Sequence, residues 1–86
     1  MSTTTVNHVL DRLQHAYDLV RMGEPRSVAP DDHLVHDLEL DSLDVIDMIA
    51  VLEEDFDPAV IEAVVDHSAD VTTVRELIDA FLAAGA

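Results

Sequence analysis

The chain has 86 residues, of which 19 are Asp or Glu and only four are Lys or Arg, so its formal net charge at pH 7 is −15. A surface with this charge repels nucleic acids and anionic membranes and attracts basic patches on other proteins. The length allows one small domain, residues 1–86. The chain has no cysteine, which excludes disulfide bonds and thiolate metal sites.

The N-terminal sequence has neither the basic start nor the apolar centre of a signal peptide, and no apolar run reaches membrane-spanning length. Leu, Ile, Val and Phe make up about a third of the chain, which is enough apolar material for a folded core. We therefore expect a soluble, cytoplasmic monomer that has no membrane span and does not bind nucleic acid.

The first predicted helix lies near the N-terminus, where apolar residues recur at spacings of three and four. Thr4 or Thr5 is a candidate cap for its start, and Gly23 is a candidate stop. Its expected buried face consists of Val6, Val9, Leu10, Leu13, Ala16, Tyr17 and Val20.

Residues 24–40 hold Pro25 and Pro30 and show no clear period. A connection of this length without regular structure is uncommon in a compact domain. We expect a long loop that contains a short helical turn. The residues expected to hold it against the core are Leu34, Val35, Leu38 and Leu40.

The second helix is predicted from Ser42 to about Phe56, with Asp41 as its N-cap and Asp44 completing a capping box. At about 100° per residue most of the acids fall on one side, with Val51 among them, but Glu53 falls on the apolar side. The apolar arc is wider than packing on one side requires, which indicates contacts on two fronts. This arc contains Leu43, Val45, Ile46, Met48, Ile49, Ala50, Leu52 and Phe56.

Two further helices are predicted after Phe56. Asp57 followed by Pro58 is typical of a helix start, and Ile61, Val64 and Val65 form the expected buried side. The last helix begins at Thr72 or Thr73, because Thr73 and Glu76 match a capping box, and Gly85 ends it. Its expected buried face is Val74, Leu77, Ile78, Phe81 and Leu82. The fold class is therefore all-α. We predict a small four-helix bundle with three longer helices, a short third helix and a long loop between the first two.

The stretch "LELDSLDVIDMIAVLEEDF", residues 38–56, resembles the modification site and second helix of acyl carrier proteins. "DVTTVRELIDAF", residues 70–81, is similar to the last helix of that family. The resemblance implies that Ser42, flanked by Asp41 and Leu43, carries 4′-phosphopantetheine, which a phosphopantetheinyl transferase attaches from coenzyme A. The negative phosphodiester would then lie at the N-terminus of a helix, where the dipole and free amides favour an anion.

The resemblance also implies a carrier that is not itself an enzyme. It would present acyl groups, of fatty acid or polyketide type, as thioesters to acyl-transfer, condensing and modifying enzymes with basic docking patches. Electrostatic docking of this kind raises encounter rate and specificity and leaves dissociation fast. The residues expected to take part in docking are Asp44, Ile46, Asp47, Val51, Glu53 and Glu54.

The sequence departs from the family pattern in three respects. Glu39 stands where the family often has the glycine of L-G-x-D-S-L. The segment between Phe56 and Thr72 is longer than usual, and arginine is the only basic residue apart from histidine. These differences favour a specialised carrier over the housekeeping carrier of fatty acid synthesis.

Other functions are weaker alternatives. Ser42 could be an ordinary helix-start serine of an unmodified acidic interaction module, or the cargo could be aminoacyl or peptidyl. A serine hydrolase is not favoured because no neighbour of Ser42 in the sequence supplies a base. His33 and His36 lack a recognised metal-ligand spacing, so we expect solvated loop histidines and no metal site.

Overall fold

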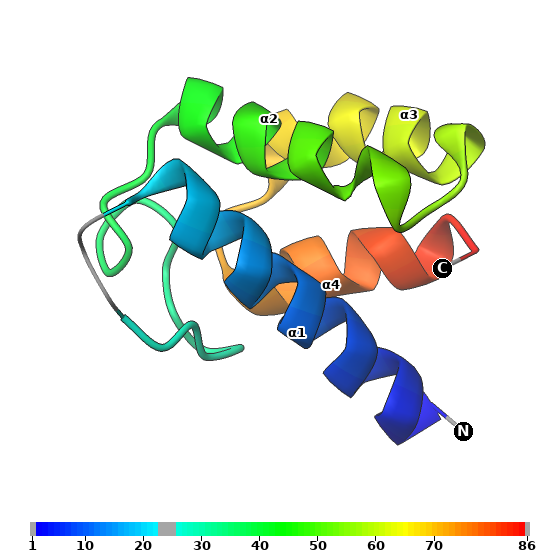
Figure 1. Cartoon of the computed structure of the whole chain (residues 1–86), viewed down its shortest axis with the longest axis horizontal. Coiled ribbons are helices and arrows are strands. Elements are labelled where there is room, and N and C mark those ends of the chain that lie inside the picture. The colour runs from blue at the N-terminus through cyan, green and yellow to red at the C-terminus, as the bar shows by residue number, and fades with distance from the viewer. Residues whose placement is uncertain (1, 23–25, 86) are drawn as a thin grey trace.

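A computed structural model of the protein describes residues 2–22 and 26–85, and its regular structure there is helical (Figure 1). The prediction of a small all-α bundle of four helices is confirmed. No helix in these two ranges is both long enough and apolar enough to cross a membrane. The α-helices are α1 (Ser2–Val20), α2 (Ser42–Val51), α3 (Pro58–His67) and α4 (Val74–Ala83), and single 3-10 turns form η1 (Leu52–Glu54) and η2 (Ser68–Asp70).

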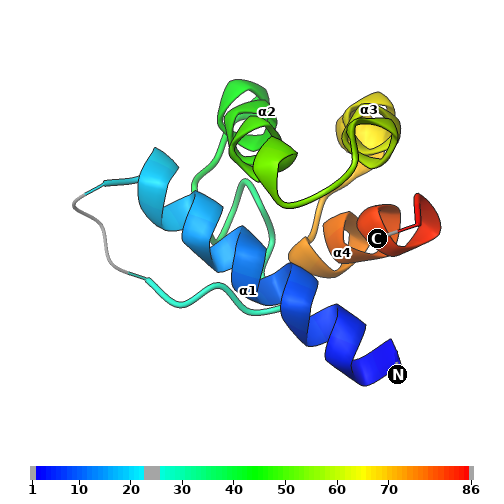
Figure 2. The same ribbon diagram turned by 45° about the vertical axis from the view of Figure 1, so that its right-hand side comes forward.

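The helices form two layers. Figure 2 shows α2 and α3 side by side, nearly end-on, above α1 and α4. Helix α1 packs against α2 and α4, and α3 packs against the same two helices, so every helix contributes to one common core. The described part of the domain measures 30 × 24 × 23 Å along its principal axes.

The predicted apolar face of α1 is confirmed. Its central residues are buried, and the others are partly buried against the same core. The helix begins at Ser2, so Thr4 and Thr5 lie within it, and the prediction that one of them caps its start is wrong. The expected stop at Gly23 lies outside the described residues.

Helix α2 is shorter than predicted, because it ends at Val51 and continues as the 3-10 turn η1. The acids Glu53, Glu54 and Asp55 follow at its C-terminal end, where the helix dipole disfavours negative charge. Phe56 then packs against Phe81 of α4, with ring centroids 4.9 Å apart. Since α2, α3 and α4 have ten residues each, the third helix is not the short one that we expected.

Helix α3 begins as predicted, with Asp57 at the N-cap and Pro58 in the first turn. Ile61 and Val64 are buried, but Val65 lies exposed on the outer side, so its expected burial is wrong. Val65 instead lines a groove on the surface of α3, so the other helices do not cover it.

Helix α4 has the predicted capping box between Thr73 and Glu76. Gly85 adopts φ +104° just after the helix, a conformation that glycine accepts without a steric penalty. The predicted face is confirmed, because Val74, Leu77, Ile78 and Phe81 are buried and Leu82 is partly buried.

The described part of the long loop, residues 26–41, is ordered by backbone contacts with the start of α4. Leu34, Leu38 and Leu40 are buried as predicted, whereas Val35 is exposed. The amides of Asp37 and Leu38 donate to the carbonyl of His33, forming the expected turn. Three backbone hydrogen bonds attach the loop to α4 and the residues just before it: Leu34 N to Thr72 O (2.9 Å), Val74 N to Asp32 O (3.0 Å) and Arg75 N to Pro30 O (2.9 Å). The chain therefore enters α2 from a fixed position.

Candidate functional site

The segment that leads into α2 is held from both sides. Leu38 and Leu40 are buried, and the Leu40 amide donates to the Leu34 carbonyl at 2.9 Å. Glu39 lies between them with φ +57°, in the left-handed region that favours glycine. Among residues 2–22 and 26–85 it is the only non-glycine residue with positive φ. This turn sets the direction in which the chain enters α2.

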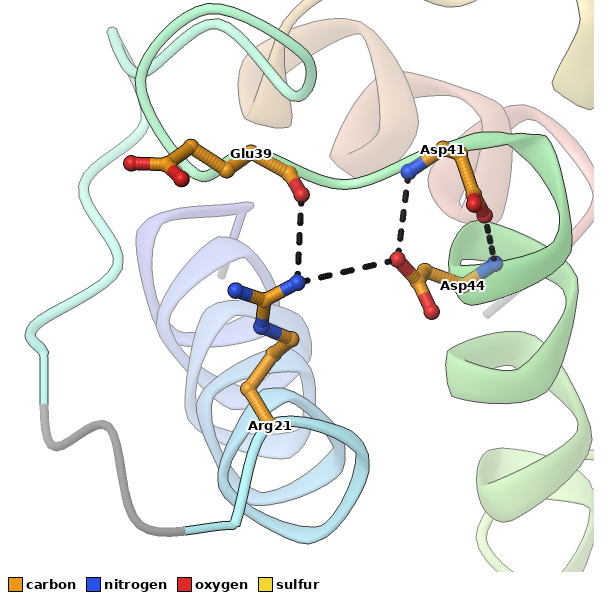
Figure 3. Close-up of polar contacts among 4 residues, drawn as sticks. All are labelled: Arg21, Glu39, Asp41 and Asp44. Carbon is orange, nitrogen blue, oxygen red and sulfur yellow. Dashed lines mark hydrogen bonds and ion pairs between the residues drawn. The ribbon is translucent and has the colours of Figure 1, made fainter.

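The predicted capping box of α2 is present (Figure 3). The Asp44 amide donates to Asp41 Oδ1 at 2.8 Å, and the Asp41 amide donates to Asp44 Oδ2 at 3.2 Å. Each carboxylate therefore satisfies an amide that has no partner within the helix. The two aspartates fix the first turn, which contains Ser42.

Ser42 is the first residue of α2, and its side chain is exposed. The amides of a first helical turn have no carbonyl to pair with inside the helix, and the macrodipole is positive there. The hydroxyl is thus accessible to another protein, and an anion attached to it would lie at the favourable end of the helix. Of its predicted neighbours, Asp41 forms the cap and Leu43 is 69% exposed.

Ser42 is one of the residues that line a groove of about 260 Å³ between the start of α2, the loop and η2. Apolar side chains dominate its lining, and they come from segments far apart in the sequence. Among them are Val35 and Leu40 from the loop, Ile46 from α2, and Ala69 and Val71 around η2. An aliphatic group tethered to Ser42 therefore has an apolar surface within reach.

The wide apolar arc of α2 is only partly covered by the core, and contact on a second front stays a prediction. Val45, Met48, Ile49 and Leu52 are buried in the core. On the other front Leu43 is largely exposed and Ile46 is 41% exposed. We call Leu43 and Ile46 the apolar strip. Its exposed side chains flank the helix turn that bears Ser42.

The predicted docking residues do not form one uniform face. Asp47, Glu53 and Glu54 are exposed. The Asp44 side chain is only 26% exposed, and its Oδ2 lies 3.9 Å from Arg21 Nη1. Val51, expected on a solvated face among the acids, is instead partly buried against the core, because the packed layer of helices reaches that flank of α2.

Arg21 connects the end of α1 with the segment before Ser42. Its Nη1 donates to the carbonyl of Glu39 at 3.2 Å and forms the ion pair with Asp44 (Figure 3). Sequence analysis did not assign Arg21 to the site, because no spacing pattern connects it with residues 18 or more positions away. The one available signal was Glu39 at a position where glycine was expected.

The loop histidines form a local contact. His33 Nδ1 accepts the amides of Val35 and His36, at 3.2 Å and 3.1 Å, and the two histidine rings lie 4.4 Å apart. Within the ranges that the structure covers, no three His, Asp or Glu side chains converge as a metal site would require.

Comparison with known proteins agrees with this geometry. Residues 7–81 match the family described as "Phosphopantetheine attachment site". An acyl carrier protein of Cyanidioschyzon merolae is 29% identical over 79 residues, which are 91% of this chain and 82% of that protein. An acyl carrier protein of Picosynechococcus sp. is 36% identical over 53 residues, which are 62% of each chain.

No solved structure matches the chain. The family match includes all four helices except the ends of α1 and α4, and it contains the whole segment from Glu39 to Glu54. The chain therefore belongs to the phosphopantetheine attachment family, that of the acyl carrier proteins, whose covalent prosthetic group is 4′-phosphopantetheine.

Proposed function

We propose that the protein carries acyl groups on 4′-phosphopantetheine attached to Ser42. The observation that supports this assignment is the exposed Ser42 at the first position of α2, where it lines an apolar groove. An attachment residue has to be reachable by a modifying enzyme, and its cargo has to find a surface nearby. Ser42 meets both requirements.

The residues around Ser42 suit a phosphodiester in spite of the acidic sequence. The carboxylates of Asp41 and Asp44 are engaged with backbone amides, and Asp44 is also paired with Arg21. These contacts disperse negative charge that would otherwise oppose the phosphate. The first-turn amides and the positive end of the α2 dipole favour the anion further.

Attachment joins the Ser42 oxygen to phosphorus while the pyrophosphate bond of coenzyme A breaks and the nucleotide half leaves. The transferase supplies the base and the magnesium ion for this step. Once attached, the group supplies a thiol that holds an acyl chain as a thioester, which is a better acyl donor than an ester. The residues of this chain position the attachment point and form the surface that partner enzymes recognise.

We assign partner docking to the exposed acids of α2 and η1 together with the apolar strip. Asp47, Glu53 and Glu54 are free to meet Arg and Lys side chains on a partner, and Leu43 and Ile46 add apolar contact near the arm. The contributions of Asp44 and Val51 are smaller, because Asp44 is engaged within the chain and Val51 is partly buried.

A second groove, of about 480 Å³, continues this surface along α3. Glu53, Glu62 and Asp66 surround an apolar floor of Pro58, Ile61 and Val65. Its acidic rim and apolar floor suit a basic, partly apolar partner surface, so we include it in the docking face.

For the cargo we propose acyl groups of fatty acid or polyketide type. The two relatives named above are called acyl carrier proteins, and the groove at Ser42 is apolar. An aminoacyl or peptidyl cargo would gain little from such a surface. Mass spectrometry of the thioester on the protein purified from its host would identify the cargo, and an amino acid there would overturn the acyl assignment.

The attachment is tested by intact mass after incubation with coenzyme A, Mg²⁺ and a broad-specificity phosphopantetheinyl transferase. We expect the wild-type mass to increase by one phosphopantetheine group, and Ser42→Ala to keep its unmodified mass. Ser27→Ala is the matched control, because Ser27 is also exposed but lies in the loop. An unmodified wild-type chain would favour the acidic interaction module instead.

A further inference from the structure

Glu39 adopts a backbone conformation that an L-residue reaches only against steric resistance. Its φ of +57° brings the side-chain Cβ close to the following carbonyl oxygen. Such conformations persist where neighbouring contacts hold them, and they cluster at functional sites. Glu39 lies three residues before Ser42, so whatever holds its turn also sets the approach to α2.

One contact that holds this turn comes from Arg21, the residue that follows α1. Arg21 Nη1 donates to the Glu39 carbonyl at 3.2 Å, and the same nitrogen lies 3.9 Å from Asp44 Oδ2. That carboxylate oxygen also accepts the Asp41 amide at 3.2 Å. In Figure 3 the guanidinium lies between the Glu39 carbonyl and the Asp44 carboxylate, while the Glu39 side chain points away from it.

These contacts are partly shielded from water. The side chains of Arg21 and Asp44 are 22% and 26% exposed, so their attraction is screened less than that of a surface pair. The guanidinium contacts the Glu39 carbonyl and the Asp44 carboxylate, and this carboxylate also accepts the Asp41 amide. These contacts connect the backbone before Ser42 with the helix turn after it.

We infer that Arg21 is a positioning residue for Ser42: through the Glu39 carbonyl and the Asp44 carboxylate it holds the left-handed turn that presents this serine to the modifying enzyme. The inference rests on the proposed attachment at Ser42. Without the guanidinium, Glu39 relaxes toward negative φ in a fraction of the molecules, and the segment before α2 shifts with it. Only the remaining fraction presents the serine correctly, which raises the apparent KM of the transferase for this protein in proportion.

The first test is the kinetics of modification at room temperature with saturating coenzyme A. Arg21→Met keeps an aliphatic stem of similar length and removes the donors. We expect a severalfold rise in KM for the carrier with little change in kcat. Arg21→Lys, which can still donate to the Glu39 carbonyl, should recover part of the loss. Arg12→Met is the matched control, because Arg12 lies on α1, is 29% exposed and pairs with Asp11 and Asp55, which are outside the turn before Ser42. It should lower stability without changing KM.

The decisive variant is a double substitution. Glycine adopts positive φ readily, so Glu39→Gly removes the need for a contact that holds the turn. We expect Glu39→Gly alone to leave KM almost unchanged, and Arg21→Met with Glu39→Gly to recover most of the loss seen in Arg21→Met. A wild-type KM for Arg21→Met, or an equal loss with and without the glycine, would overturn the inference.

A second readout uses the unmodified protein and does not depend on attachment. Hydrogen exchange measured by NMR should be faster at the Asp41 amide in Arg21→Met, since this amide donates to the carboxylate that Arg21 pairs with. The Glu76 amide, bonded to Thr73 Oγ1 in the capping box of α4, serves as the internal reference and should not change. Unchanged exchange at Asp41 contradicts the role of Arg21 even if the wild type is modified. Failure of the wild type to be modified contradicts the proposed function instead.

Discussion

Asp41 and Asp44 each accept a hydrogen bond from the backbone amide of the other, across the first turn of α2. This reciprocal pair secures the start of a ten-residue helix, which is short enough to depend on its cap. Because Ser42 lies between the two aspartates, the cap supports both the stability of the helix and the position of the serine.

The contribution of this cap can be measured with a pair of variants. Asp41→Ala removes the side chain that accepts the Asp44 amide, so we expect the free energy of unfolding to fall by about 1 kcal/mol, within the usual range for N-caps. Asp41→Asn should be nearly neutral, because asparagine caps helices as well as aspartate does. Urea denaturation followed by circular dichroism gives both values. An alanine variant as stable as the wild type would show that the Asp41 side chain contributes nothing to stability.

The docking face yields a prediction about rates. Asp47→Lys places a positive charge at an exposed position of α2, so we expect association with a basic partner enzyme to slow severalfold at low salt. Dissociation should change less, and helicity should be retained. Stopped-flow or surface-based binding at several salt concentrations separates the two rates.

Asp79→Lys is the control for this experiment. Asp79 is exposed on α4, and its substitution by Lys changes the net charge by the same amount as Asp47→Lys. It should slow association less than Asp47→Lys does. Equal slowing by the two variants would mean that total charge matters and that the face on α2 has no particular role. Asp44→Lys is a poor probe of docking, because it also removes the cap and the pair with Arg21.

Local signals in the sequence were sufficient for the helix starts near the site. Both capping boxes join residues three positions apart, so their hydrogen bonds follow from residue identity and helix geometry alone. The helical period also showed that the apolar arc of α2 is too wide for packing on one side, and Leu43 and Ile46 are indeed exposed. The predicted end of α2 at Phe56 was wrong. Where the helix stops depends on the packing of Phe56 against Phe81, a contact between distant segments that the local sequence does not show.

Contacts between distant segments could not be predicted in this way. Val35 and Val65 are as apolar as their buried neighbours, and only the packing of the loop and of α3 leaves them exposed. The pairing of Arg21 with Asp44 depends on the angle between α1 and α2. The family resemblance supplied the function of the segment, but it did not reveal the arginine that supports it.

The carboxylate of Glu76 should make stability depend on pH in the acid range. Hydrogen bonds from the Thr72 hydroxyl, and from the amides of Thr72 and Thr73, lower the pKa of Glu76 below its ordinary value of 4.5. A group with a lowered pKa in the folded state stabilises the fold at pH values above its ordinary pKa. That stabilisation is lost as the pH falls through the lower folded-state value.

Thr72→Val tests this directly, because it removes the hydroxyl and keeps the shape of the side chain. We expect the pKa of Glu76, followed by NMR of its carboxyl carbon, to rise toward the ordinary value. The stability difference between wild type and Thr72→Val should be largest near neutral pH and should shrink as the pH falls below about 4.5. An identical titration of Glu76 in both proteins would show that the Thr72 hydroxyl is not the main cause of the lowered pKa.

The excess of negative charge should make the fold more stable in salt. With 19 acids and four arginines, most carboxylates have no cationic partner even if every arginine forms an ion pair, and their mutual repulsion opposes the compact state. Salt screens this repulsion over distances of about 10 Å at 0.1 M, and a gain of about 1 kcal/mol would raise Tm by about 4–8 °C in a domain of this size. Thermal unfolding of the unmodified protein in increasing NaCl, and in MgCl₂ at matched ionic strength, measures the effect. Equal rises in the two salts indicate screening alone, a larger rise in MgCl₂ indicates cation binding, and a Tm that does not change in either salt contradicts the prediction.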